Sequence, residues 1–498
     1  MHAHLWASFS EYDTLALIIA LCANQTFVTK KKMICKSNPE LSITSLAYSK
    51  DAALTWFAPL SGLPWAMLLR SAAENHPDNR FDIIVADPLA TIESENGISK
   101  VCYANGTEET YTDDPFALIQ SLQAQLLPAV SPMMALPFIG GALGYFSYDL
   151  GRQVENISTI AEHDIPLPDL ALGIYDWALI VDHQEQTVTL VEPQSAERET
   201  WLEQHLRAFS QQHSATDLNS VDSFSLTSTW SSNMTKEDYC NKFNKIQDYL
   251  LSGDCYQINL AQRFSAYYTG DEWQAYLTLE AENGAPFSGF IRLKQGAILS
   301  VSPERFLQLR DGLIETKPIK GTRPRCKNTV QDNANAVALQ NAEKDRAENL
   351  MIVDLLRNDI GRVATPGTVR VPHLFEIESF PAVHHLVSTV SGELPADHNA
   401  TDLLKACFPG GSITGAPKVR AMEIIEELEP HRRSIYCGSI GYVSRCGTMD
   451  TSITIRTLVA NEQKIHAWAG GGIVADSNPD SEYQETLDKL SKILPTLQ

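Results

Sequence analysis

The clearest periodic pattern of apolar residues lies in the second half of the chain. Apolar side chains recur at helical spacing from Tyr239 to Leu250, which predicts an amphipathic helix. Thr235 and Asp238 have the three-residue spacing of a capping box, so we expect the helix to begin there. Residues 255–264 then alternate between apolar and polar side chains and predict a strand. Similar patterns predict helices over 333–359, 416–429 and 480–494.

Short apolar runs dominate the first half of the chain, where residues 50–190 predict mixed strands and helices. Residues 81–87 read FDIIVAD, a run typical of a buried strand. Residues 170–183 and 187–193 predict a strand pair joined by a polar turn. The stretch 138–152 is rich in glycine and aromatic residues, which indicates backbones that approach each other closely.

Composition suggests how the chain is divided. A length of 498 residues predicts about two or three domains, or one large one. Serine, threonine and glutamine dominate residues 209–234, so we interpret this segment as a linker between an N-terminal region, 33–208, and a C-terminal domain, 235–498. We expect residues 1–32 to be a poorly ordered extension or the result of a start codon assigned too early. A cryptic export signal is the alternative, but no basic residue precedes the short apolar run 15–23.

Charge and cysteine content narrow the function. The excess of 61 acidic over 39 basic residues gives a net charge of −22, which argues against nucleic-acid binding. An anionic small molecule could still bind in a locally basic pocket or on a metal ion. The nine cysteines are odd in number and include no Cys-x-x-Cys pair, so we expect a reducing, cytoplasmic location and no disulfide framework. We expect no membrane span.

Two predicted helices carry acidic pairs at a spacing that puts both members on one face. These pairs are Asp345 with Glu348, and Glu482 with Glu485. If the helices face each other, four carboxylates meet, and a cation must offset their repulsion. Hard oxygen ligands without a histidine or cysteine cluster indicate Mg²⁺. The alternative is two solvent-exposed helix faces.

Two glycine-rich segments could bind an anion. Residues 408–430 lead through FPGGSITGAPK into a helix with Pro417 near its start, where exposed backbone N–H groups suit a carboxylate. The segment lacks the Lys-Ser/Thr of a Walker A loop. Residues 466–477 contain three successive glycines, which would let a ligand approach the backbone. The alternatives are an ordinary helix cap and a strand bulge.

The stretch KPIKGTRPR, residues 317–325, places Lys320 among proline and glycine. A hairpin through 309–315, with Asp-Gly at 311–312 as its turn, would return Lys320 to the level of Glu304. An acid and an amine would then share one pocket, where the acid could protonate a leaving group and the neutral amine could attack carbon. The alternative is a surface ion pair.

Seven strings in this order resemble one family, the chorismate-utilising enzymes that include anthranilate, isochorismate, salicylate and aminodeoxychorismate synthases. The resemblance runs from about Leu60 to the C-terminus. It implies an α+β fold, with a large antiparallel β-sandwich core, helices packed outside, and 235–498 as the chorismate-binding catalytic domain. The strings are GDCYQINLAQRF, SPERF, AENLMIVDLLRND, HHLVS, FPGGSITGAPK, GGGIVADS and EYQET.

Within the family, two positions point to one activity. Lys320 lies in a Pro-Ile-Lys-Gly-Thr string typical of aminodeoxychorismate synthase component I, where anthranilate synthases have alanine. Gln257 replaces the lysine that activates water in isochorismate and salicylate synthases. The resemblance therefore implies amination of chorismate at C4 for 4-aminobenzoate and folate synthesis, with Glu304 as the acid and Lys320 as a covalent nucleophile. Anthranilate synthase component I is the alternative, and a non-catalytic chorismate- or tryptophan-binding subunit is the alternative of another class.

The resemblance also implies ligands and a partner. Glu348 and Glu485 would hold Mg²⁺ with Asp345 and Glu482 close by. Because the chain has no Gly-x-Cys-x-Gly motif, ammonia would come from a glutamine amidotransferase subunit in a heterodimer. The family's N-terminal Leu-Leu-Glu-Ser string reads Leu-Leu-Arg-Ser here, which leaves open whether bound L-tryptophan regulates the enzyme. Substrate contacts are expected at Tyr442, Arg456, Gly471, Gly472, Thr414, His385 and Lys489. A suspected tryptophan pocket comprises Ser71, Asp78, Asn79, Arg80, Phe81, Pro286, Phe287 and Ser288.

Overall fold

The computed structural model describes residues 31–34, 38, 40–72, 78–133, 136–212, 223–379 and 383–498. Two large sheets dominate it, and every pair of neighbouring strands runs antiparallel. The larger sheet has the order β1 (Lys31–Ile34), β2 (Leu41–Leu46), β11 (Thr187–Pro193), β10 (Ala178–Asp182), β4 (Phe81–Val85), β3 (Met67–Arg70), β15 (Phe287–Arg292), β16 (Gly296–Ser302), β25 (Thr457–Asn461), β26 (Lys464–Ile473), β14 (Gln257–Thr269) and β12 (Ser225–Leu226), while β13 (Ser231–Ser232) and β22 (Gly415–Ala416) also pair with β14.

The smaller sheet begins at the strand that contains the catalytic candidate Lys320. Its order is β19 (Ile319–Pro324), β21 (Val383–Glu393), β18 (Leu313–Thr316), β17 (Arg305–Arg310), β24 (Met449–Ile453), β23 (Ser439–Ser444), β8 (Gly141–Phe146), β9 (Leu170–Tyr175), β5 (Ala90–Glu95), β6 (Ile98–Tyr103) and β7 (Glu108–Tyr111), with β20 (Arg370–Ser379) also on β21. Strands from both halves of the chain enter each sheet. The predicted boundary at 209–234 therefore does not separate one sheet from the other.

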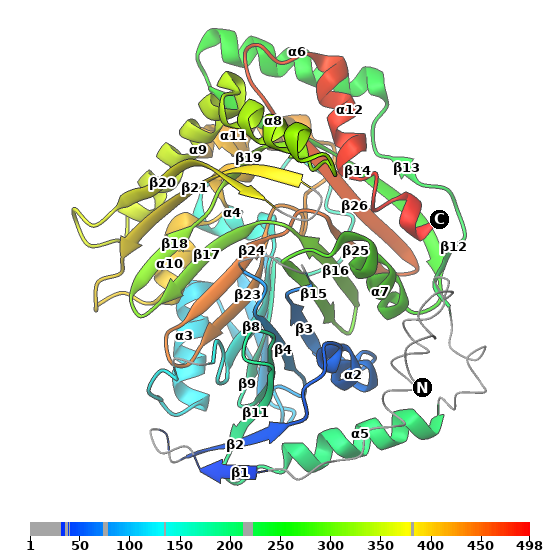
Figure 1. Ribbon diagram of the computed structural model, residues 1–498, viewed down its shortest axis with the longest axis vertical. Helices are drawn as coiled ribbons and strands as arrows, with labels where there is room; N and C mark the ends of the chain where they lie inside the picture. The colour runs from blue at the N-terminus through cyan, green and yellow to red at the C-terminus, as the bar shows by residue number, and fades with distance from the viewer. Residues whose placement is uncertain are drawn as a thin grey trace.

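Helices surround the sheets, as Figure 1 shows. Helices α6 and α12 lie at the same end of the molecule as α8 and β19 (Figure 1). In the described part of the chain, no helix combines the length and the apolar character needed to cross a bilayer. The helices are α2 (Ala52–Phe57), α3 (Pro115–Leu126), α4 (Gly151–Val154), α5 (Arg198–Gln212), α6 (Lys236–Ser252), α7 (Glu272–Asn283), α8 (Thr329–Gln340), α9 (Glu343–Gly361), α10 (Ala400–Cys407), α11 (Lys418–Leu428) and α12 (Pro479–Lys489).

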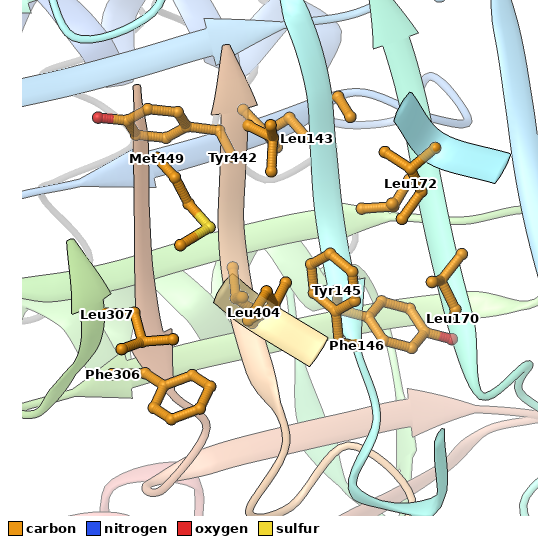
Figure 2. Close-up of a cluster of buried hydrophobic side chains, with 14 of the residues drawn as sticks. Leu143, Tyr145, Phe146, Leu170, Leu172, Phe306, Leu307, Leu404, Tyr442 and Met449 are labelled. Carbon is orange, nitrogen blue, oxygen red and sulfur yellow. The ribbon is translucent and has the colours of Figure 1, made fainter. Parts of the chain in front are cut away.

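One apolar core joins the two sheets. Ile298 and Trp468 from the larger sheet and Leu172 and Leu307 from the smaller sheet belong to the same buried cluster. Figure 2 shows part of this cluster along β8, β9, β23 and β24. The other face of the larger sheet is buried in a second cluster, with side chains from α2, α5 and α7. The expected α+β sandwich with helices outside is confirmed.

The helix that follows the predicted capping box forms as expected. The Thr235 side chain accepts a hydrogen bond from the Asp238 backbone N–H, and the Asp238 carboxylate accepts one from the Thr235 backbone. These two bonds satisfy N–H groups that have no partner inside α6. The strand predicted over 255–264 is β14, and those predicted over 170–183 and 187–193 are β9, β10 and β11.

The predicted helix 333–359 is wrong in one respect, because the structure divides it into α8 and α9. Asn341 and Ala342 lie between the two helices and do not have helical geometry; Ala342 has φ −71° and ψ 105°. The first part begins earlier than predicted because the Asn328 side chain accepts hydrogen bonds from the backbone of Val330 and Gln331. This break gives α9 its own start at Glu343 and places its first two turns, with Asp345 and Glu348, beside β19.

Candidate active site

A cavity of about 640 Å³ lies between β19, β26, α9 and α12. The sequence-predicted residues that line it come from several segments, spread along the chain from Glu304 to Lys489. They are Glu304, Lys320, Asp345, Glu348, His385, Arg456, Gly472, Glu482, Glu485 and Lys489. Gly471 lies beside them, since a Cβ atom there would be 2.9 Å from Glu482 Oε2.

Glu304 is a buried carboxyl group at the floor of this cavity. Burial raises its pKa, and the charge of Lys320 and a hydrogen bond with Ser412 oppose that shift without cancelling it. A carboxyl group with a raised pKa keeps its proton to higher pH. Glu304 therefore has the protonation behaviour of a general acid.

A bulge in β19 positions Lys320. Lys320 pairs with Leu386 and Thr322 with His385, so Gly321 is the additional residue between them. Gly321 has φ +76°, and a Cβ atom there would be 2.7 Å from Asp345 Cγ. Glycine is therefore required both by the backbone conformation and by the close approach of α9. The predicted turn at Asp311 and Gly312 is also present, with φ values of +51° and +77°.

Gly321→Ala is expected to lower stability and kcat/KM, because the added methyl group must displace Asp345. Left-handed strain alone costs about 1–2 kcal/mol. Gly312→Ala is the matched control, because Gly312 has nearly the same φ but no atom closer than 4.0 Å to its Cβ position. Thermal unfolding and steady-state kinetics of both variants check the prediction. Equal losses of stability and of kcat/KM in both variants would contradict the proposed role of the close approach between Gly321 and Asp345.

The two acidic pairs lie on α9 and α12 and face the same cavity, and each carboxylate is paired with a basic group. Arg323 contacts Asp345 at 3.2 Å, and Lys489 contacts Glu485 at 2.7 Å. The ammonium of Lys344 lies 3.8 Å from Glu348 and 3.9 Å from Glu482. The four carboxylates have the ligand chemistry that suits Mg²⁺. In the conformation described, however, no three acidic, histidine or cysteine side chains of the described residues converge closely enough to hold a metal ion.

The electrostatics of the acidic pairs reflect this arrangement. Burial raises the pKa of Glu348, and the neighbouring charges of Asp345 and Glu482 add to the effect. Burial also raises the pKa of Glu482, with a further contribution from Glu485. For Glu485, burial alone would raise the pKa, but Lys489, Lys320 and Lys344 together outweigh burial and the pKa is lowered. The neighbouring basic groups therefore do not fully compensate the negative charge of the carboxylates at this site.

Arg456 supplies a positive charge at the Glu304 side of the cavity. Burial lowers the pKa of its guanidinium, and Glu304 opposes this shift. Among the described residues, its guanidinium forms no ion pair, whereas the basic groups of Lys489 and Arg323 each do. A largely buried arginine that lacks a carboxylate partner and lines a cavity suits a carboxylate ligand.

Arg456→Lys is expected to raise the KM for the anionic substrate about 10- to 100-fold and to change kcat less, because lysine cannot form two parallel hydrogen bonds to a carboxylate. Arg445→Lys is the control, because Arg445 donates to the Ile139 carbonyl at 2.8 Å and lies outside this cavity. Steady-state kinetics of both variants check the prediction. An unchanged KM in Arg456→Lys would exclude Arg456 as a carboxylate ligand.

Two predicted substrate contacts lie elsewhere. Tyr442 lines a different cavity, and Thr414 is fully buried, with its hydroxyl bonded to the Gly410 carbonyl at 3.1 Å. One residue that the sequence reasoning missed is Tyr436, which lines the same cavity as Glu304 and Lys320 and stacks on Trp468 with ring centroids 6.0 Å apart. Both tyrosines occur within YCGSIGY, so the sequence offered a signal but not the choice between them.

A buried arginine that the sequence reasoning also missed holds the cavity wall together. Arg433 forms two bonds to Glu429, at 2.9 and 2.7 Å. It also donates to the carbonyls of Ile413 at 3.0 Å and Asn259 at 2.7 Å, both residues of the cavity wall. Arg433 thereby fixes the segment that carries Ser412, the hydrogen-bond partner of Glu304.

The second cavity, of about 230 Å³, contains most of the suspected tryptophan pocket. Ser71, Asp78, Arg80, Phe81, Pro286, Phe287 and Ser288 line it, but Asn79 does not. Arg70, at the position where the family has glutamate, contacts Glu280 and lies 3.1 Å from Asp82. The arginine that replaces the family's glutamate at position 70 is therefore explained by its ion pairs with Glu280 and Asp82.

Comparisons with known proteins agree with this geometry. A family described as chorismate binding enzyme matches residues 66–495. Aminodeoxychorismate synthase component 1 of Escherichia coli (strain K12) is 57% identical over 92% of this chain and 98% of that protein. Anthranilate synthase component 1 of Aquifex aeolicus is 36% identical over 87% of this chain and 90% of that protein. The crystal structure of anthranilate synthase component I from Streptococcus pneumoniae has a TM-score of 0.72, is 33% identical, and covers 84% of this chain and 93% of its own. The chain belongs to the family of chorismate binding enzymes.

Proposed function

We propose that the protein is the synthase component that converts chorismate and ammonia to 4-amino-4-deoxychorismate, for 4-aminobenzoate and folate synthesis. The observation that carries the proposal is a lysine, Lys320, beside a buried acid with a raised pKa, Glu304, in one cavity. Relatives at 56–57% identity carry the name aminodeoxychorismate synthase component 1 and support the same reaction. A catalytically silent binding subunit would not need this pair.

Two side chains of the protein, Glu304 and Lys320, account for all the proton transfers and bond changes of the proposed reaction. Glu304 gives its proton to the C4 hydroxyl, which leaves as water, while the neutral amine of Lys320 attacks C2 and the ring double bonds shift. Ammonia then forms the C4–N bond as the double bonds shift back and the C2–N bond to Lys320 breaks. The surplus proton of the incoming nitrogen returns to Glu304. The net reaction is chorismate plus ammonia to 4-amino-4-deoxychorismate plus water.

Substrate binding is assigned to the basic side of the cavity. Arg456 and Lys489 would bind carboxylates of chorismate, His385 would line the ring site, and Gly471 and Gly472 would let the substrate approach β26. Glu348, Glu485, Asp345 and Glu482 would hold Mg²⁺, which when bound neutralises the ring carboxylate of the substrate.

Ammonia would come from a glutamine amidotransferase subunit in a heterodimer. The name component 1 carried by the relatives implies a partner subunit for those proteins. The described cysteines are all free thiols, which fits a cytoplasmic enzyme. L-tryptophan would occupy the smaller cavity, where Phe287 already stacks with the Arg305 guanidinium at 5.0 Å.

Product identification tests the proposed function. The protein would be incubated with chorismate, Mg²⁺ and ammonium, and separately with glutamine and an added glutaminase subunit. We expect 4-amino-4-deoxychorismate in both mixtures and no release of pyruvate. Anthranilate with an equal amount of pyruvate would instead identify an anthranilate synthase. No turnover in either mixture would favour a binding subunit.

A further inference from the structure

Lys344 lies where the two acidic helices come together. It belongs to the first turn of α9, and its ammonium lies 3.8 Å from Glu348 Oε1 on the same helix and 3.9 Å from Glu482 Oε1 on α12. Arg323 and Lys489, which also line the cavity, each form an ion pair with only one of the two helices in the described part of the chain. Lys344 forms ion pairs with both helices. A lysine ammonium therefore occupies the position of a bridging cation.

The geometry of the other basic groups is different. Lys489 pairs with Glu485 on its own helix and also donates to the Gly470 carbonyl at 2.7 Å, so α12 and β26 hold it in place. Arg323 reaches Asp345 from β19. The Lys344 side chain is 52% exposed, and its flexible stem can turn toward solvent without leaving a cavity behind.

A divalent cation and this ammonium cannot share the site. Both would bind the carboxylates of Glu348 and Glu482, and like charges at such a distance repel. A carboxylate oxygen must also move to about 2.1 Å from Mg²⁺, a far shorter distance than its present one to the Lys344 nitrogen. The cation can therefore enter only when the ammonium leaves.

We propose that Lys344 is a built-in competitor of the divalent cation: it joins α9 to α12 in the metal-free enzyme and swings out to solvent when the metal binds. The proposal rests on the magnesium site of the proposed function. It makes Lys344 a determinant of metal affinity rather than a catalytic residue. It also explains why the carboxylates of α9 and α12 do not converge among the residues that the structure describes.

Isothermal titration of Mg²⁺ into substrate-free enzyme tests the proposal. Lys344→Met keeps the length of the side chain and removes its charge, so we expect Mg²⁺ to bind about 5- to 20-fold more tightly than to the wild type. Lys236→Met is the control, because Lys236 pairs with Asp480 of α12 at 2.6 Å, outside the cavity. Its Mg²⁺ affinity should stay within about twofold of the wild type.

Acetylation of the wild-type protein gives a second test that needs no variant. Lys344 should react with acetic anhydride several-fold faster in the presence of Mg²⁺, as measured by mass spectrometry of its peptide, while the labelling of Lys236 should not change. Equal or weaker Mg²⁺ binding by a folded Lys344→Met, or unchanged labelling of Lys344, would overturn the competitor role. Absence of Mg²⁺ binding by the wild type would overturn the metal site itself, and product identification would still judge the reaction separately.

Discussion

Lys320→Ala is expected to lower kcat with ammonia on the order of a thousandfold or more, because the variant loses the nucleophile that captures C2. Folding should be little affected, since the Lys320 side chain is only partly buried and projects into the cavity. KM for chorismate should change far less than kcat. Steady-state kinetics and thermal unfolding of the purified variant would measure all three.

Lys317→Ala is the matched control for this variant. Lys317 lies three residues earlier in the same segment, pairs with Glu378 at 3.4 Å and does not line the active cavity. Its removal should leave kcat within about twofold of the wild type. A comparable loss of kcat in both variants would mean that the segment, and not the Lys320 amine, is what matters.

Glu304→Gln is expected to lower kcat by about 10²- to 10⁴-fold, because glutamine has nearly the same shape but cannot give a proton to the leaving hydroxyl. Glu315→Gln, on the neighbouring strand β18 and outside the cavity, is the control. A fall of less than about tenfold in Glu304→Gln would exclude Glu304 as the general acid.

The pH dependence follows from the same residue. The active form of Glu304 is protonated and burial raises its pKa, so kcat should fall as pH rises through this raised value. The profile must be measured at a constant concentration of free ammonia, because ammonium itself loses a proton as pH rises. The falling limb should be missing in Glu304→Gln. A limb that persists in that variant would belong to another group.

Local patterns predicted much of the site. The three-residue spacing of Asp345 with Glu348, and of Glu482 with Glu485, correctly placed each pair on one helix face. The Asp-Gly turn correctly predicted the hairpin between β17 and β18. Such features depend on the nearest few residues, which is why the sequence alone can reveal them.

Other features depend on packing between distant segments. Tyr436 and Tyr442 border different cavities. Which cavity each tyrosine borders depends on where β23 lies in the smaller sheet. The ion pair between Lys344 and Glu482 joins α9 to α12. The sequence of neither helix alone predicts that the two helices lie close together. The break between α8 and α9 comes at Asn341 and Ala342. Because alanine is the strongest helix former and asparagine only a moderately weak one, helical periodicity gave no sign of the break.

The most direct test of the account is to look for the covalent adduct. The wild-type protein would be mixed with chorismate and Mg²⁺ without ammonia, quenched in acid, digested and analysed by mass spectrometry. We predict that the peptide containing residues 317–325 gains the mass of chorismate less one water, with the modification on Lys320, and that Lys320→Ala gains none. If the wild-type peptide remains unmodified in this mixture, or if the added mass lies on another residue, Lys320 is not the nucleophile.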